Sequence, residues 1–163
     1  MQITTYPADV LRKKATPFEG FGTPARQLFE EMLETMYSNN GVGLAAPQVS
    51  KSLRLFIFDI SPKQNDPQLF INPRIIRAYG KSPSTEGCLS LPELEAKVTR
   101  ADKITVQAMD LEGKQFEVDA EGLLAIVIQH ELDHLEGMLL VDRMSRLQKI
   151  RARKKLDYLK GLK

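Results

Sequence analysis

The feature that most constrains the fold is an apolar run at residues 123–128, which leads directly into Gln129-His130-Glu131-Leu132-Asp133-His134. A helix that is apolar all round is buried on all sides, so this segment, residues 121–136, is predicted to run through the middle of the domain. Gly137 ends it. Burying the charged residues that follow the run costs several kcal/mol unless they are paired or bind a metal. The sequence therefore predicts a central helix with a chemically active end.

His130 and His134 are the two histidines of the chain and are four residues apart. On a helix this spacing places both imidazoles on one face, one turn apart, where they can bind a single metal ion. Glu131 lies on an adjoining face, close enough to exchange protons with a metal-bound water. The H-E-x-x-H pattern is typical of zinc hydrolases. Two surface histidines with this spacing by chance are the alternative, and the apolar run before them argues against it.

A catalytic metal site usually has three protein ligands and one position left for water. The third ligand could be Cys88, Asp133, Glu136 or a remote carboxylate. Cys88 follows Gly87 in a tight turn, where a ligand can be held rigidly, although a lone cysteine is more often an inert core residue. The spacing favours Cys88 without excluding the others. Because it is the one cysteine, no internal disulfide can form and nothing requires an oxidising compartment.

The rest of the pattern predicts an α+β fold, in which short antiparallel or mixed β-sheets pack around the buried helix. An N-terminal helix over residues 23–38 begins with Thr23 as its cap and Pro24 at its first position, and Met32 and Met36 face the core. Residues 82–85 are expected to form a loop, and Pro73 predicts an edge or bulged strand. We expect one domain over residues 1–163. The predicted strands and the C-terminal helix cover residues 53–60, 69–79, 97–100, 103–110, 114–119 and 145–159.

The C-terminal segment is strongly basic. Nine of the 23 basic residues and one of the 21 acidic residues lie within residues 143–163, so the preceding body is mildly acidic. Such a tail is either a solvated helix face or a contact with an anionic surface, for which RNA is the favoured partner and neither DNA nor a membrane is expected. No apolar run approaches the length of about 18 residues that spans a bilayer, and the N-terminus has no targeting pattern, so we expect a cytoplasmic protein.

Three stretches together resemble the peptide deformylase family, in its compact bacterial type. They are Gly41-Val42-Gly43-Leu44-Ala45-Ala46-Pro47-Gln48, Glu86-Gly87-Cys88-Leu89-Ser90 and Gln129-His130-Glu131-Leu132-Asp133-His134-Leu135. Their order and spacing match that family, and the likeness covers essentially the whole chain. The resemblance implies an enzyme that removes the N-formyl group from the N-terminal formyl-methionine of newly made polypeptides and releases formate. It also implies that the basic C-terminal helix docks on the ribosome.

The resemblance further implies a role for each site residue. Cys88, His130 and His134 would bind one divalent metal ion, with Fe²⁺ as the physiological ion and Zn²⁺ or Ni²⁺ able to substitute. Glu131 would be the general base and acid. The oxyanion hole would be formed by Gln48 and the backbone N–H of Leu89. Gly43 would offer its backbone to the substrate. Glu86 would pair with Arg100 and brace the cysteine loop. The methionine side chain of the substrate would enter a pocket lined by Val42, Leu123, Ile126 and Val127.

Two other functions are compatible with parts of this pattern. A metallopeptidase that cuts internal peptide bonds shares H-E-x-x-H, but usually takes a carboxylate or a third histidine as its remaining ligand. A ribosome-bound module with a closed structural zinc would need a fourth protein ligand and would leave Glu131 without a function. Release of formate from formyl-Met-Ala, without cleavage of an unformylated peptide, separates the deformylase interpretation from the metallopeptidase. A Glu131→Ala variant that keeps the metal and loses deformylation separates it from the structural-zinc module.

Overall fold

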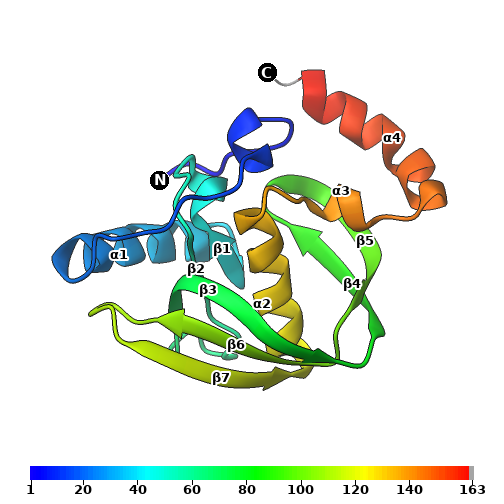
Figure 1. The fold of residues 1–163 in the computed structure, drawn as a ribbon. Helices are drawn as coiled ribbons and strands as arrows, with labels where there is room; N and C mark the ends of the chain where they lie inside the picture. The colour runs from blue at the N-terminus through cyan, green and yellow to red at the C-terminus, as the bar shows by residue number, and fades with distance from the viewer. Residues whose placement is uncertain (162–163) are drawn as a thin grey trace.

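The computed structural model describes residues 1–161 and has an α+β fold with two antiparallel sheets, as predicted (Figure 1). The larger sheet has the strand order β1-β2-β3-β6-β7, and the smaller sheet pairs β4 with β5. The elements are η1 (Asp9–Arg12), α1 (Thr23–Ser38), β1 (Gly43–Ala45), η2 (Ala46–Val49), β2 (Leu55–Phe58), β3 (Gln68–Tyr79), β4 (Ser82–Cys88), β5 (Leu91–Arg100), β6 (Lys103–Met109), β7 (Gln115–Glu121), α2 (Gly122–Leu135), α3 (Leu140–Arg143) and α4 (Arg146–Gly161).

Helix α2 lies between the two sheets and packs against β1, β2, β6 and β7 of the larger one (Figure 1). Its inner side chains Ile128 and Leu135 are fully buried in a cluster with Phe56 of β2. The expectation that α2 is buried on all sides is wrong for its first turns, since Leu123 is 55% exposed and Ile126 is partly exposed. These side chains face a cavity, and an apolar cavity wall has the same sequence pattern as a core.

Helix α1 packs against β1 and β2 of the larger sheet, and its buried residues cluster with Leu55 and Ile57 of β2. Met32 and Met36 are fully buried, which confirms that the methionine stripe belongs to the core. The predicted start of the helix is wrong by one residue. Thr23 is the first helical residue and makes no capping hydrogen bond, and the residue before the helix is Gly22, with φ +74°. Glycine adopts such a conformation without the steric cost that a side chain would add.

Strand β3 carries the predicted irregularity at Pro73. Its register with β6 shifts between Ile71 and Arg74, which is a bulge at the residue that lacks a backbone N–H. The predicted edge is also found in part: β2 pairs with β3 only up to Ile71, so among the described residues 74–79 pair with β6 alone and have one free edge. The predicted loop at residues 82–85 is wrong. These residues begin β4 and pair with β5, where Pro83 is tolerated because the sheet has only two strands.

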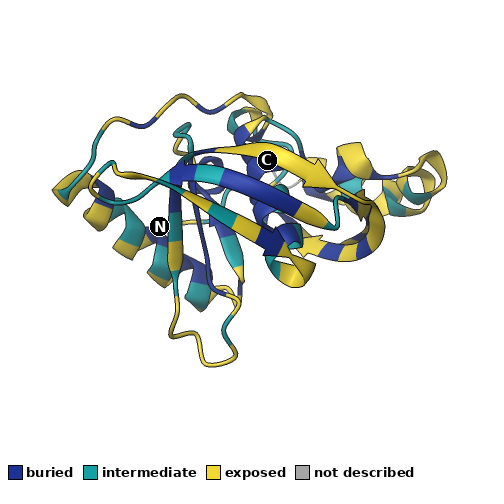
Figure 2. Cartoon of the chain, turned by 60° about the horizontal axis from the view of Figure 1, so that its bottom comes forward, coloured by how far each residue is buried: buried dark blue, intermediate teal, exposed yellow. Residues whose placement is uncertain are grey.

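The C-terminal region consists of the short helix α3, which the sequence pattern did not predict, and the basic helix α4. Helix α4 is mainly exposed (Figure 2). Leu159 of this helix is buried but Leu147 and Ile150 are exposed, so the helix docks mainly through its last turns. The predicted tail and domain extend to Lys163, which lies outside the described residues. No helix in residues 1–161 is long and apolar enough to cross a membrane.

Candidate active site

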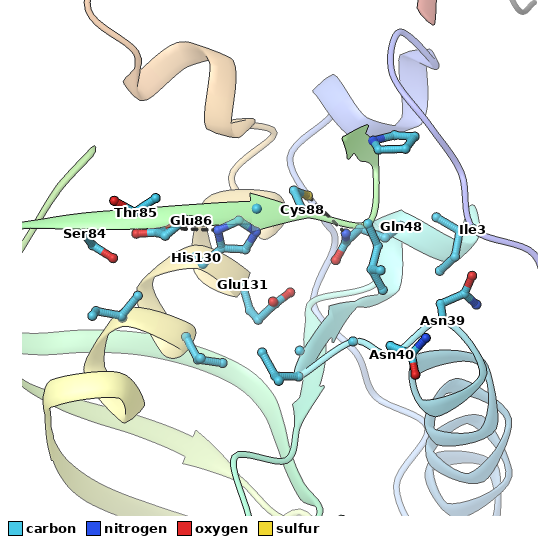
Figure 3. A pocket seen from close by; sticks show the side chains of 18 of the residues that line it. Ile3, Asn39, Asn40, Gln48, Ser84, Thr85, Glu86, Cys88, His130 and Glu131 are labelled. Carbon is cyan, nitrogen blue, oxygen red and sulfur yellow. Dashed lines mark hydrogen bonds and ion pairs between the residues drawn. The ribbon is translucent and has the colours of Figure 1, made fainter. Parts of the chain in front are cut away.

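Two elements that are distant in sequence bring three possible metal ligands together. Helix α2 presents His130 and His134 on one face, and the end of β4 presents Cys88. The ligand atoms of the three residues all lie within 4.8 Å of one another, and Cys88 Sγ is 3.3 Å from His134 Nε2. Figure 3 shows Cys88 and His130 side by side at the wall of a cavity. One thiol and two imidazoles at these separations suit a single divalent transition-metal ion.

Asp133 and Glu136, the two acidic residues considered as the third ligand, are paired with basic side chains. Asp133 accepts hydrogen bonds from Arg100 and Arg143. Glu136 forms ion pairs with Arg54 at 2.6 Å and with Lys14 at 3.0 Å. The structure therefore leaves Cys88 as the partner of the two histidines.

The electrostatics of this cluster favour a bound cation. Burial lowers the pKa of His134 well below its ordinary value, so its ring is neutral and able to bind a metal. At His130 burial also lowers the pKa, but hydrogen bonds with Cys88 and Glu86 and the charge of Glu131 outweigh burial and raise the pKa well above its ordinary value. A metal ion at His130 would therefore compete with a proton for the ring.

Glu86 on β4 orients His130. The His130 Nδ1 atom is 2.9 Å from Glu86 Oε1, so Nδ1–H donates to the carboxylate and leaves Nε2 for a ligand. Arg100 donates to both oxygens of Glu86, at 2.7 and 2.9 Å, which is the pair expected from the sequence. Burial alone raises the pKa of Glu86, but the donors Arg100 and His130 lower it to about 2, so this carboxylate is ionised. The Glu86–His130 contact was not predicted, because it depends on where β4 meets α2.

Glu131 is buried beside the ligand cluster, and its Oε2 atom has no hydrogen-bond partner within residues 1–161. Burial raises its pKa to about 7, against the opposing charges of His130 and Arg100. A carboxyl group with a pKa near neutrality can both accept and return a proton. Its position at the cavity wall next to His130 suits that role (Figure 3).

Gln48 of η2 is held in one orientation by the backbone and side chains around it. Its Oε1 accepts a hydrogen bond from Ala45 N–H at 2.9 Å, so its NH₂ group points the other way. Nε2 lies 3.2 Å from Ser90 Oγ and 3.6 Å from Cys88 Sγ. The donor group of Gln48 is thus aimed at the ligand cluster. Ser90 is fully buried, and the sequence pattern did not assign it a role.

The cluster opens into a cavity of about 720 Å³, large enough for a segment of peptide. Two apolar side chains on its wall are unusually accessible, Val42 with 51% and Leu123 with 55% of their surface exposed. Asn39, Asn40 and Thr85 add polar groups that the sequence did not single out. Two further predicted site residues, His134 and Arg100, are buried and do not line the cavity. The predicted site residues that do line the cavity are Val42, Gly43, Gln48, Glu86, Cys88, Leu89, Leu123, Ile126, Val127, His130 and Glu131.

The fold and this site define a hydrolase of the H-E-x-x-H class in which a cysteine joins the two histidines. The chain belongs to the polypeptide deformylase family, whose family model matches residues 1–150, and it is an enzyme of that family. The peptide deformylase of Tolumonas auensis is 46% identical over 159 residues, which cover 98% of this chain and 95% of the relative. That of Chromobacterium violaceum is 46% identical over 156 residues, covering 96% and 93%.

Solved structures agree with this assignment. A peptide deformylase from Legionella pneumophila superposes with a TM-score of 0.92 at 45% identity, and the match covers 99% of this chain and 95% of that one. A peptide deformylase from Plasmodium falciparum superposes with a TM-score of 0.93 at 32% identity, covering 97% and 94%. The similarity extends over nearly the whole of both chains, so it includes η2, β4 and α2, which carry the residues of the site.

Proposed function

We propose that this enzyme removes the N-formyl group from the N-terminal formyl-methionine of newly made polypeptides and releases formate. The observation that carries the proposal is the convergence of Cys88, His130 and His134 beside the buried carboxylate of Glu131, next to a cavity with exposed apolar side chains. Family membership supports the same reaction.

Cys88, His130 and His134 would hold one divalent metal ion. When bound, the ion would supply Lewis acidity, which lowers the pKa of water and polarises a carbonyl oxygen. One thiolate and two imidazoles accept several divalent metals, and the donor set does not select among them. We propose Fe²⁺ as the physiological ion, with Zn²⁺ or Ni²⁺ able to substitute.

Glu131 would manage the protons of the reaction. It accepts a proton from the water that attacks the formyl carbon, and it returns this proton to the amine nitrogen as the C–N bond breaks. Its pKa of about 7 suits both steps near neutrality. The products are formate and a free methionyl N-terminus.

Two donors would stabilise the negative charge that develops on the formyl oxygen, the Gln48 NH₂ group and the Leu89 backbone N–H. Because Gln48 is fixed by Ala45 and Ser90, its donor needs little reorganisation when the charge forms. The loss of one such donor typically costs about 2.7–4 kcal/mol of transition-state stabilisation.

The substrate would bind along β1. In the part of the chain that the structure describes, this strand pairs only with β2, so its second edge, at Gly43, is available to the backbone of an extended peptide. The methionine side chain would enter the apolar part of the cavity. The residues proposed to line that pocket are Val42, Leu123, Ile126 and Val127.

The Glu131→Ala variant tests the mechanism. We expect metal content equal to that of the unmodified protein, together with loss of formate release from formyl-Met-Ala. Metal analysis and a formate assay on the same sample measure both. Full activity in this variant would exclude the proposed role of Glu131. Cleavage of an unformylated peptide by the unmodified protein would instead support a metallopeptidase.

We also propose that α4 docks the enzyme on ribosomal RNA, in the cytoplasm, where formylated chains emerge. The supporting observation is its exposed basic surface, which includes Lys149, Arg151 and Lys154. Exposed Leu147 and Ile150 on the same helix add apolar contact area.

A further inference from the structure

We propose that Arg143 is a positioning residue for His130, to which it is connected by three buried charged side chains. These three are Asp133, Arg100 and Glu86, and together they form a continuous series of charge-assisted hydrogen bonds from the surface to the candidate metal centre. The inference rests on the proposed function only in taking His130 as a metal ligand.

The outer half of the series joins α3 to α2. Arg143 Nη2 donates to Asp133 Oδ1 at 2.6 Å, and Arg143 Nε donates to Oδ2 at 3.0 Å. Arg100 Nη1 donates to the same Oδ2 atom at 2.7 Å. Asp133 therefore accepts three bonds, of which two come from Arg143. The 9% exposure of its side chain leaves little room for water to replace them.

The inner half of the series shares a single oxygen atom. Glu86 Oε1 accepts a hydrogen bond from Arg100 Nη2 at 2.7 Å and another from His130 Nδ1 at 2.9 Å. A shift of Arg100 therefore changes the position and charge of the group that orients the imidazole. Short charge-assisted bonds of this kind are strong and directional.

Charge balance makes Arg143 important for this series. Glu86 and Asp133 carry two negative charges, and Arg100 and Arg143 carry two positive charges. Without Arg143, both carboxylates would compete for Arg100, whose side chain is 4% exposed. Arg100 already donates to Asp133 through Nη1 and to Glu86 through Nε and Nη2, so a shift of its guanidinium toward Asp133 would lengthen its bonds to Glu86. An uncompensated buried charge is costly, so the arrangement around His130 must change.

The backbone around Arg143 favours a fixed position. Arg143 is the last residue of α3, and the nearby Val141 and Met144 are buried. Its side chain is 39% exposed and lines a groove of about 400 Å³ together with Arg54 and Arg74. The series thus begins at a solvent-accessible side chain on the side of α2 away from the substrate cavity.

The Arg143→Gln variant tests this inference, and Arg12→Gln is its matched control. Both arginine side chains are 39% exposed and both form an ion pair with an aspartate, but the partner of Arg12 is Asp142, which is outside the series. The readout is the affinity for Co²⁺, measured in competition with a chelator through the visible absorption of the thiolate complex. This measurement does not depend on enzymatic activity.

Loss of a direct partner of a metal-binding histidine typically costs about 10–100-fold in metal affinity. Arg143 acts from further away, so we expect Arg143→Gln to bind Co²⁺ about 3–10-fold more weakly, while Arg12→Gln stays within about twofold. Arg143→Lys keeps the charge but loses the two-pronged contact, and should fall between Arg143→Gln and the unmodified protein.

Equal Co²⁺ affinity and equal absorption spectra in Arg143→Gln and Arg12→Gln would overturn the inference, whatever the loss of thermal stability. If Arg143→Gln does not fold, Arg143→Lys decides by the same measurement, and an affinity equal to that of Arg12→Gln would overturn it. Failure of the unmodified, metal-loaded protein to release formate would overturn the proposed function alone, because the Co²⁺ comparison would still test the role of Arg143.

Discussion

A Cβ atom added to Gly43 would lie 2.3 Å from Glu131 Oε1, far closer than any Cβ contact in a protein. The glycine was expected to give a substrate room to approach the backbone. The structure adds a second reason, since the missing side chain is the space in which the Glu131 carboxylate lies. Strand β1 and helix α2 are thus fitted to each other at the residue proposed to move protons.

Gly43→Ala should therefore displace the Glu131 carboxylate. A misplacement of about 1 Å in a reacting group can cost on the order of 100-fold in rate, and we expect a loss of that order in kcat/KM for formate release. Gly87→Ala in the wall of the same cavity should cost much less, because its Cβ would be 3.9 Å from the nearest atom, Leu94 O. Equal activity in the two variants would contradict this account.

Local sequence patterns were sufficient to predict the parts of the site that lie on one element. The spacing of His130 and His134 depends only on the helical repeat, and the burial of Met32 follows from the same periodicity. The contact of Glu86 with His130 and that of Arg143 with Asp133 could not be predicted. Both join elements whose relative positions are determined by the packing of the whole domain.

The errors in the fold prediction have the same origin. Residues 82–85 are Ser-Pro-Ser-Thr, a composition typical of a turn, yet Ser84 pairs with Val98 because β5 offers a complete partner strand. Tertiary pairing here overrides local preference. The apolar pattern alone predicted burial for Leu123, because an apolar helix gives no sign of which of its faces borders a cavity, and only the family resemblance placed this residue in a pocket.

Removal of the metal should abolish formate release, and added Ni²⁺ or Fe²⁺ should restore it. Cys88→Ser should prevent restoration at ordinary metal concentrations, because a serine hydroxyl does not ionise near neutrality and is a poor ligand for these ions. Metal titration of the chelator-treated proteins provides the measurement. Full restoration in Cys88→Ser would exclude the thiolate as a required ligand.

Exposure to air should inactivate the Fe²⁺ form faster than the Ni²⁺ form. A thiolate bound to ferrous iron can be oxidised to sulfenic and higher acids, and Cys88 is the one cysteine of the chain. Activity followed over time, with mass spectrometry for oxygen added to Cys88, measures the effect. Identical decay of the two metal forms would argue against this chemistry.

The hydrogen bonds around Asp59 predict a dependence of stability on pH that does not involve the metal. Burial raises the pKa of Asp59, but donors from Ser61, Tyr37 and Asp66 outweigh burial and lower the pKa overall. The pKa of Tyr37 is raised to about 12 by burial and by its 2.6 Å bond to Asp59. This pair joins α1 to the end of β2.

The signs of the two shifts define two pH ranges. The contribution of Asp59 is present above its unfolded pKa of about 3.9 and is lost as pH falls through its lower folded pKa. The contribution of Tyr37 is present below about pH 10 and is lost as pH rises toward 12. Asp59→Asn should therefore lower the free energy of unfolding by about 1.5–3 kcal/mol at pH 7 and by less at pH 3. Asp9→Asn on the surface is the control, and urea denaturation at both pH values is the measurement.

The basic helix α4 predicts binding to the ribosome that depends on salt. Charge reversal of the exposed residues Arg151 and Lys154 should weaken co-sedimentation with ribosomes, and loss of two phosphate contacts should reduce the slope of log K against log salt by about two. Formate release from formyl-Met-Ala should be unchanged, because neither residue lines the cavity.

The control for this experiment reverses Lys51 and Lys63, which are also exposed but lie outside α4. It changes the net charge by the same amount, so it separates a local contact from a general electrostatic attraction. Weaker binding in both double variants would indicate that net charge alone attracts the enzyme. Unchanged binding in the α4 variant would show that the helix is a solvated surface, and the role proposed for it would then be wrong.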